Sequence, residues 1–198
     1  MMRYTAEELR GFAARIMEKA GLSPAARDIF SDSLVQADLR GISSHGVTHL
    51  AAYAKRVELG LVDGFAVPEL LADGGSLLSV DGKNGMGAYV GAWTMDVCIQ
   101  RARERGSCFA AVSHCNHFGY AAYFTERAAE AGMLGLAIAN GPKALPPTGG
   151  SAPLLGTNPL AVSLPTGVAG RPLTLDMATS AVARGKVTLA RKTGQDIP

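Results

Sequence analysis

Residues 77–112 read LLSVDGKNGMGAYVGAWTMDVCIQRARERGSCFAAV, and this stretch decides the fold class of the chain. Its two short apolar runs, 77–80 and 108–112, have the length and composition of buried strands. Between them, residues 88–105 carry a helical pattern that stops at Gly106, and glycine commonly ends a helix in this position. A strand, a helix and a second strand in this order predict a mixed α/β fold.

The same succession of short apolar runs and helical patterns continues towards the C-terminus. Apolar runs at 134–139 and 173–175 predict two more strands, and a helical pattern at 120–131 ends at Gly132. Residues 140–159 are rich in glycine and proline and predict a long ordered loop. Loops of this length inside a compact domain are usually functional.

Three helices are predicted ahead of this region, each followed by a glycine. Thr5 and Glu8 form a capping-box pattern that opens the first of them. The three helices are expected between Thr5 and Gly21, between Ser23 and Gly41, and between Ser44 and Gly60. After Pro68 the sequence changes from helical patterns alone to short apolar runs that alternate with helical patterns. We therefore expect residues 1–67 to be the helical part of the first domain and residues 68–198 to form a mixed α/β domain.

The composition excludes several classes of protein. Only 18% of the 198 residues are charged, against a usual value near ~25%, which argues against disorder and coiled coil. The net charge of +2 is not concentrated in any run, so a nucleic acid is not an expected partner. No apolar stretch predicts a membrane span or a signal peptide. Cys98, Cys108 and Cys115 have no disulfide or metal-knuckle spacing, and the expected location is the cytoplasm.

The glycine-rich segment GKNGMG at 82–87 is not a dinucleotide fingerprint. Val90 stands where the pattern GxGxxG needs its third glycine, and the lysine of a phosphate-binding loop is also absent. A Rossmann domain is therefore disfavoured. The segment either offers backbone amides to an anion or forms a tight turn that leads into a helix.

The four histidines occur in two pairs, in SHGVTHL at 44–50 and in SHCNHFG at 113–119. Histidine exchanges protons near neutral pH, so it is the usual general acid or base. His45 is the leading candidate, because the start of the third predicted helix disfavours a charged imidazole and the Ser44 hydroxyl can bond to the ring. The alternative is that Ser44 only caps the helix and His45 lies on the surface.

Two other chemistries use the same residues. His45 and His49 are four positions apart, a spacing that can ligate a metal, with the second histidine pair or Cys115 as further donors. Gly46 stands where the metalloprotease motif HExxH has its glutamate, which disfavours a metal-dependent hydrolase and predicts no metal. A nucleophilic Cys115 is disfavoured because its neighbour His114 is adjacent in sequence, and adjacent side chains rarely face each other.

Two later motifs place small polar side chains at the edges of apolar runs, GTNPLA at 156–161 and LDMATS at 175–180. Ribose, amide and carboxylate groups of ligands are commonly bound at such edges. The alternative is turn chemistry at Asn158–Pro159 and a helix N-cap at Thr179 or Ser180.

Taken in order, these motifs resemble one family. RGISSHGVTHL, VDGKNGMG, NHFG, the ANG and GG loop, GTNPLA, LDMATS and ARGK are similar to the malate/L-lactate dehydrogenase family of non-Rossmann NAD(P)-dependent oxidoreductases, which includes ureidoglycolate and sulfolactate dehydrogenases. The resemblance covers residues 3–198. It implies reversible hydride transfer between a 2-hydroxy acid and NAD or NADP, a homodimer, and a non-Rossmann nicotinamide-binding domain in residues 68–198.

The resemblance also implies roles for single residues. His45, supported by Ser44, is expected to exchange the hydroxyl proton, with His117 as the alternative acid or base. The expected substrate-binding residues are Arg40, His49, Thr157 and Asn158. The expected cofactor-binding residues are Asn140, Gly141, Asp176, Met177 and Ala178.

Three departures from the family qualify this expectation. His49 stands where the family often has an arginine for the substrate carboxylate, so Arg40 or a residue outside this sequence is expected to supply the charge. Lys186 replaces an aspartate of the imine-reducing branch, which disfavours imine reduction. Family members continue beyond Pro198, so we expect an N-terminal portion that is poorly active alone. The alternative is an inactive fragment or interaction module.

Overall fold

The computed structural model describes residues 3–180, 190, 194 and 196. The chain divides into two compact units, Met1–Tyr123 and Phe124–Pro198. Both contain helix and strand, so the mixed α/β fold class predicted from the sequence is confirmed. Within the described residues, no helix is both long enough and apolar enough to cross a membrane.

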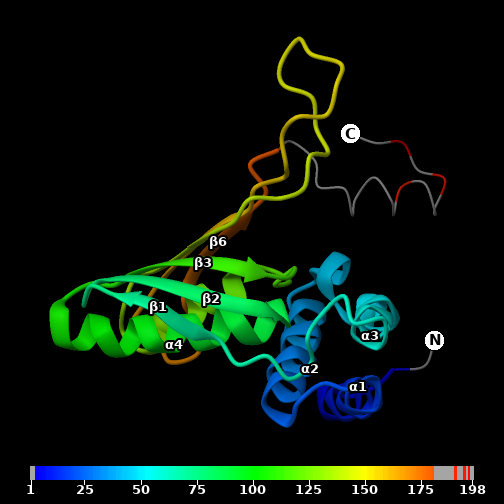
Figure 1. Cartoon of the computed structure of the whole chain (residues 1–198), viewed down its shortest axis with the longest axis horizontal. Coiled ribbons are helices and arrows are strands. Elements are labelled where there is room, and N and C mark those ends of the chain that lie inside the picture. Colours follow the sequence, from blue (N-terminus) through cyan, green and yellow to red (C-terminus); the bar gives the residue numbers. More distant parts are fainter. Residues whose placement is uncertain (1–2, 181–189, 191–193, 195, 197–198) are drawn as a thin grey trace. The chain divides into compact units, whose positions relative to one another are not determined.

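Three α-helices open the first unit: α1 (Ala6–Ala20), α2 (Pro24–Leu39) and α3 (Leu50–Glu58). They gather at one end of this unit (Figure 1). The predicted capping box is present: the Glu8 amide donates to Thr5 Oγ1 at 3.2 Å and the Thr5 amide donates to Glu8 Oε2 at 2.7 Å. Gly21 ends α1 with a φ of 99°, which a side chain would oppose.

The third helix begins later than the sequence predicted. Two short 3-10 turns, η1 (Ser43–His45) and η2 (Val47–His49), precede α3. Gly46 separates them in an extended conformation, and a Cβ there would lie 1.9 Å from Asp38 Oδ1. Because α3 starts only at Leu50, His45 and His49 do not share the face of one α-helix, and its dipole does not act on His45 as we had argued.

The N-terminal helices share one hydrophobic core. Met17, Phe30, Leu34 and Leu50 are each at most 4% exposed. Met86 joins the same core from the strand and helix region that follows. Burial of each such side chain contributes about 2 kcal/mol of transfer free energy, so this core ties the helices to the sheet.

The sheet of the first unit contains β1 (Glu69–Asp73), β2 (Leu77–Gly85) and β3 (Phe109–Cys115) in this order. β1 is antiparallel to β2, and β2 is parallel to β3. Parallel neighbours need a crossover, which α4 (Gly87–Arg105) supplies while lying along the sheet (Figure 1). The strand–helix–strand prediction is confirmed. β1 was not predicted, because its sequence ELLAD shows no alternation of apolar and polar residues.

The second unit contains most of α5 (Ala122–Glu130) and an antiparallel sheet in the order β4 (Gly135–Ile138), β5 (Leu160–Leu164) and β6 (Leu173–Met177). The predicted helix and strands at 120–131, 134–139 and 173–175 are confirmed, whereas β5 was missed.

A buried polar chain joins α5 to this sheet. The hydroxyls of Thr125 and Ser163 lie 2.7 Å apart, and those of Ser163 and Thr174 lie 3.0 Å apart. The Thr174 hydroxyl donates to Glu126 Oε1 at 3.0 Å. Since buried polar groups are costly unless paired, this chain fixes how α5 lies on the strands.

The two compact units divide between Tyr123 and Phe124, within α5. The first unit contains residues from both sides of residue 67, because α4 contacts α2, and Met86 and Ala88 lie in the core of the N-terminal helices. The domain division after residue 67 and the assignment of residues 68–198 to cofactor binding stay predictions.

Loss of the capping box provides a first prediction. Thr5→Ala removes the acceptor for the Glu8 amide and is expected to lower Tm by about 3 °C. Differential scanning calorimetry checks this. Thr5→Ser, which keeps the hydroxyl, should retain the wild-type Tm, and an equal loss in both variants would contradict the capping argument.

Candidate active site

The segment that carries His45 is held by an aspartate of α2. Asp38 Oδ2 accepts a hydrogen bond from the Val47 amide at 2.9 Å, and Gly46 lets the chain pass directly against the same carboxylate. His45 and Ser44 therefore sit in a turn with a defined backbone. The Ser44 hydroxyl lies within hydrogen-bonding distance of His45 Nδ1, at 3.0 Å, and makes no helix cap. Of the two interpretations of Ser44, this geometry favours a hydrogen bond to the His45 ring.

His45 and His117 form the centre of the candidate site. Their rings are stacked, with centroids 5.8 Å apart and planes inclined by 14°. His45 comes from η1, whereas His117 follows β3. The fold thus brings together two of the histidines that the sequence singled out.

Tyr53 of α3 is the third member of this cluster. Its hydroxyl is hydrogen-bonded to His117 Nδ1, and the two ring centroids are 6.0 Å apart. The Tyr53 ring also meets Phe30 edge to face at 4.8 Å, which anchors it to the core. Burial raises the pKa of Tyr53 to about 12, against a smaller opposite effect of Arg56.

His117 has an unusual electrostatic environment. His117 is exposed at the surface, but desolvation by the groups packed around its ring lowers its pKa to about 4, and the Coulombic effects of His45, His49 and Arg56 act in the same direction. His117 is consequently neutral at physiological pH.

The backbone at His117 is fixed by contacts on both sides. Asn116 donates through Nδ2 to the Asn84 carbonyl at 2.8 Å and to the Gly85 carbonyl at 3.1 Å. Arg56 Nη2 donates to Asn116 Oδ1 at 3.1 Å. Gly87 lies so close that a Cβ there would be 2.3 Å from the Asn116 carbonyl oxygen.

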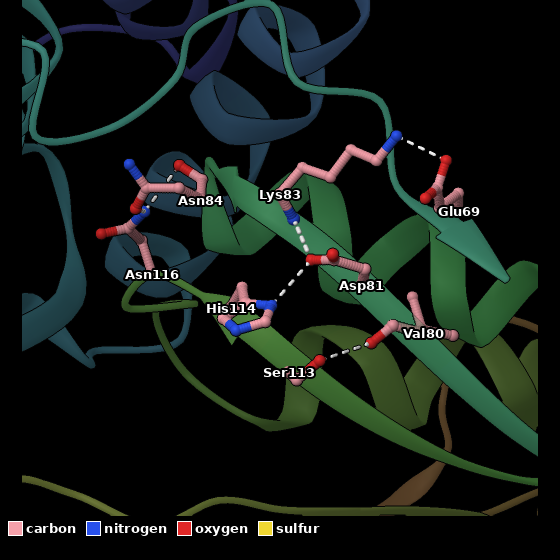
Figure 2. Close-up of polar contacts among 8 residues, drawn as sticks. All are labelled: Glu69, Val80, Asp81, Lys83, Asn84, Ser113, His114 and Asn116. Carbon is pink, nitrogen blue, oxygen red and sulfur yellow. Dashed lines mark hydrogen bonds and ion pairs between the residues drawn. The ribbon is translucent and has the colours of Figure 1, made fainter. Parts of the chain in front are cut away.

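Figure 2 shows the same strand ends: His114 reaches Asp81, while Asn116 faces Asn84. His114 Nδ1 lies 3.1 Å from Asp81 Oδ1, a pairing that does not involve the His45–His117 cluster. Lys83 and Asn84 have φ values of 48° and 58°. The segment 82–87 thus forms a tight irregularity of β2 and the entry to α4, which is the second of its two interpretations.

The expected carboxylate-binding residues differ in their surroundings. His49 Nε2 lies 2.7 Å from the Ser44 carbonyl oxygen, and since a carbonyl only accepts, Nε2 carries a hydrogen. That bond occupies one of the two ring nitrogens of His49. Arg40 is the exposed residue that follows α2.

The predicted cofactor and substrate residues of the second unit also come together. An open pocket of about 490 Å³ is lined by residues at and after the end of β4, around the start of β5 and after β6: Ile138, Ala139, Asn140, Asn158, Pro159, Leu160 and Thr179. Asn158 has a φ of 37°, and its Oδ1 accepts from the Gly141 amide at 2.9 Å. Asn140 and Asn158 thus both line this pocket.

The remaining predicted residues lie beside this pocket. The Thr179 amide and hydroxyl both donate to the Thr157 carbonyl, at 2.9 Å and 3.2 Å. On β6, Asp176 pairs with Ala161 and Met177 pairs with Leu160. Ala178 follows β6. The helix expected after Thr179 or Ser180 and the motif ARGK with Lys186 lie outside the described residues.

The structure bears on the two alternative chemistries, a metal site at the histidines and a nucleophilic Cys115. Within the described residues, no group of three or more His, Cys, Asp or Glu side chains is arranged to hold a metal ion. Desolvation raises the pKa of the Cys115 thiol to about 11, and the thiol donates to the Asn116 carbonyl at 3.2 Å. A thiol with this pKa is not a thiolate near neutral pH, which disfavours a nucleophilic role.

Sequence reasoning missed three residues of the first-unit cluster: Tyr53, Arg56 and Asn116. Tyr53 lies inside the third predicted helix, where its spacing indicates a core-facing residue and no chemistry. Asn116 directly precedes His117 in a quoted motif, and this adjacency was the one available signal. Arg56 carried none, because its contact with Asn116 spans 60 positions of sequence.

The depressed pKa of His117 predicts how stability changes with pH. In the unfolded chain His117 is protonated below about pH 6.5, whereas in the folded chain it is protonated only below about pH 4. The free energy of unfolding should therefore fall as the pH drops from about 6.5 to about 4. Urea unfolding at several pH values checks this. His117→Gln should reduce the slope, and equal slopes in both proteins would contradict the assignment.

Residues 4–198 match the malate/L-lactate dehydrogenase family. The chain is 39% identical over 197 residues to a malate dehydrogenase of Pyrococcus abyssi, covering all of this chain and 54% of that protein. It is 35% identical over 199 residues to an L-sulfolactate dehydrogenase of Methanothermobacter thermautotrophicus, covering 57% of that protein and 100% of this chain.

Comparison with solved structures agrees. The malate dehydrogenase structure from Pyrococcus horikoshii OT3 superposes with a TM-score of 0.90 at 37% identity, over 94% of this chain and 53% of that one. The chain thus spans about half the length of the relatives that it matches. From motif order, from the family match over nearly every residue and from the shared fold, the chain belongs to the malate/L-lactate dehydrogenase family.

Proposed function

We propose that this chain carries the proton-transfer residues and part of the cofactor site of an NAD(P)-dependent oxidoreductase that interconverts small 2-hydroxy acids and 2-oxo acids. The observation that carries the proposal is the stacked His45–His117 pair, with Ser44 on one ring and Tyr53 on the other. Family membership supports the reaction class. The same proposal includes a homodimer that acts in the cytoplasm.

In this proposal His45 is the general acid and base. It takes the hydroxyl proton of a 2-hydroxy acid during oxidation and returns it to the forming alkoxide during reduction. The Ser44 hydroxyl at 3.0 Å from Nδ1 orients the imidazole. His117, the alternative acid or base, is the weaker candidate because a pKa of about 4 makes it a poor base.

The substrate carboxylate is assigned to positively charged or donor groups near the same turns. Arg40 is the leading one, since a guanidinium binds a carboxylate in two-pronged fashion. His49 is a poorer clamp because its Nε2 hydrogen is directed to the Ser44 carbonyl. Thr157 and Asn158 are assigned to the polar groups of the substrate on the second unit.

The residues of the second unit fit part of a nicotinamide cofactor. Asn140 and Thr179 offer amide and hydroxyl groups around an open pocket, which suits a carboxamide or ribose hydroxyls. Gly141, Asp176, Met177 and Ala178 are assigned to the same site. When bound, the cofactor supplies or accepts the hydride.

The test is a fluorescence titration of the chain with NADH and NADPH, followed by oxidation assays with pyruvate, oxaloacetate and sulfopyruvate. Because the chain spans about half the length of its relatives, the complete protein encoded by its gene is assayed in parallel. Saturable binding with turnover in either preparation supports the proposal. Failure of both would refute it and favour an interaction module without catalysis.

A further inference from the structure

The hydrogen bonds around His117 define which of its nitrogens carries the hydrogen. Nδ1 faces two groups: the Tyr53 hydroxyl and the Gly119 amide, the latter at 3.4 Å. A backbone amide can only donate, so Nδ1 is the acceptor and the neutral ring carries its hydrogen on Nε2. The amide contact is long, which leaves Tyr53 as the stronger partner.

Tyr53 is suited to act as a fixed donor. Its ring is packed against Phe30 at a centroid distance of 4.8 Å, and the side chain is half-buried on α3. A phenol whose pKa lies near 12 stays protonated throughout the physiological range. Its hydroxyl therefore has a hydrogen to give to Nδ1 throughout that range.

We propose that Tyr53 is a positioning residue that holds His117 in the tautomer with hydrogen on Nε2, so that His117 serves as a neutral hydrogen-bond donor to the substrate oxygen while His45 exchanges the proton. The role of His117 as a donor to the substrate, the catalytic half of the proposal, rests on the proposed function. The tautomer of His117, the other half, rests on the hydrogen bonds alone.

The charges around His117 favour the same division of roles. His45, His49 and Arg56 face its ring as positive or potentially positive groups, and Tyr53 is neutral. A second imidazolium in this cluster would be repelled. A neutral imidazole can still polarise a carbonyl through its N–H, and it avoids the charge that would raise the energy of a protonated His45.

The proposal is tested by ¹⁵N NMR of histidine-labelled wild-type chain and of Tyr53→Phe, followed through a pH titration. In the wild type we expect an unprotonated Nδ1 and a protonated Nε2 on His117 from neutral pH down to about pH 5. Tyr53→Phe keeps the ring that packs on Phe30, removes the donor, and should raise the His117 pKa by about one unit.

Tyr123→Phe is the matched control. It removes a phenol hydroxyl that donates to Asp32 Oδ2 at 3.0 Å in the same unit. Its His117 resonances should match the wild type. A hydrogen on Nδ1 in the wild type, or identical titrations in Tyr53→Phe and wild type, would overturn the proposal.

A kinetic measurement separates this proposal from the proposed function. In the preparation that shows turnover, Tyr53→Phe should lower kcat by about tenfold without changing the KM for NADH. An unchanged kcat would overturn the catalytic half. If no preparation turns over, the proposed function and the donor role fall together, while the NMR result still decides the tautomer.

Discussion

Replacing His45 by alanine is expected to lower kcat for 2-oxo acid reduction by about 10²–10⁴-fold while NADH binding is retained. The imidazole is the group assigned to proton exchange, and no neighbour can take its place. Its stacked partner His117 has a pKa of about 4, and the Ser44 hydroxyl is far too weak an acid. Steady-state kinetics and NADH fluorescence on the same preparation measure both quantities.

His114→Asn is the matched control for this experiment. His114 belongs to the same unit but pairs with Asp81, and asparagine tolerates its left-handed φ of 48°. The His114→Asn variant should retain a kcat close to that of the wild type. Equal losses in the two variants would indicate general damage, and full activity of His45→Ala would remove His45 from the mechanism.

The second large effect is expected from Gly87→Ala, which should lower the free energy of unfolding by about 3 kcal/mol. Gly87 is buried at the start of α4, and an alanine Cβ would lie 2.3 Å from the Asn116 carbonyl oxygen and 2.4 Å from that of His117. Backbone atoms cannot swing aside as a flexible side chain does. The added methyl group must therefore displace the segment that carries His117, and the ¹⁵N signals of the His117 ring should shift.

Gly11→Ala is the control for Gly87→Ala. In α1 the added Cβ would meet only the end of the Arg15 side chain at 3.4 Å, so alanine should stabilise the helix by about 0.5 kcal/mol. Urea unfolding of both variants supplies the comparison. Wild-type stability in Gly87→Ala would contradict the close packing between α4 and the His117 segment.

The third helix marks where local reasoning failed. Its periodicity predicted a start at Ser44, but the Asp38 carboxylate accepts the Val47 amide and Gly46 passes against it in an extended conformation. This contact joins two segments that are not neighbours in sequence. No helical pattern within residues 44–60 carries information about it.

Sequence alone was sufficient for the elements that are stabilised by interactions between near neighbours. The Thr5–Glu8 box and the helix ends at Gly21 and Gly106 depend on residues a few positions apart. The strand–helix–strand order was predictable because each element has its own local pattern, although β2 and β3 pair with each other across the intervening helix. The motif order was likewise enough to identify the family. It also singled out His45 and His117 as candidates for function.

Tertiary packing was needed to assign separate roles to these two histidines. The ring of His117 is stacked on His45 from η1, bonded to Tyr53 from α3, and held through Asn116 and Gly87 at the strand ends. A pKa and a tautomer depend on desolvation and on donors within a few ångströms. These groups meet only because the helices and the sheet share one core, and spacing along the chain does not encode that meeting.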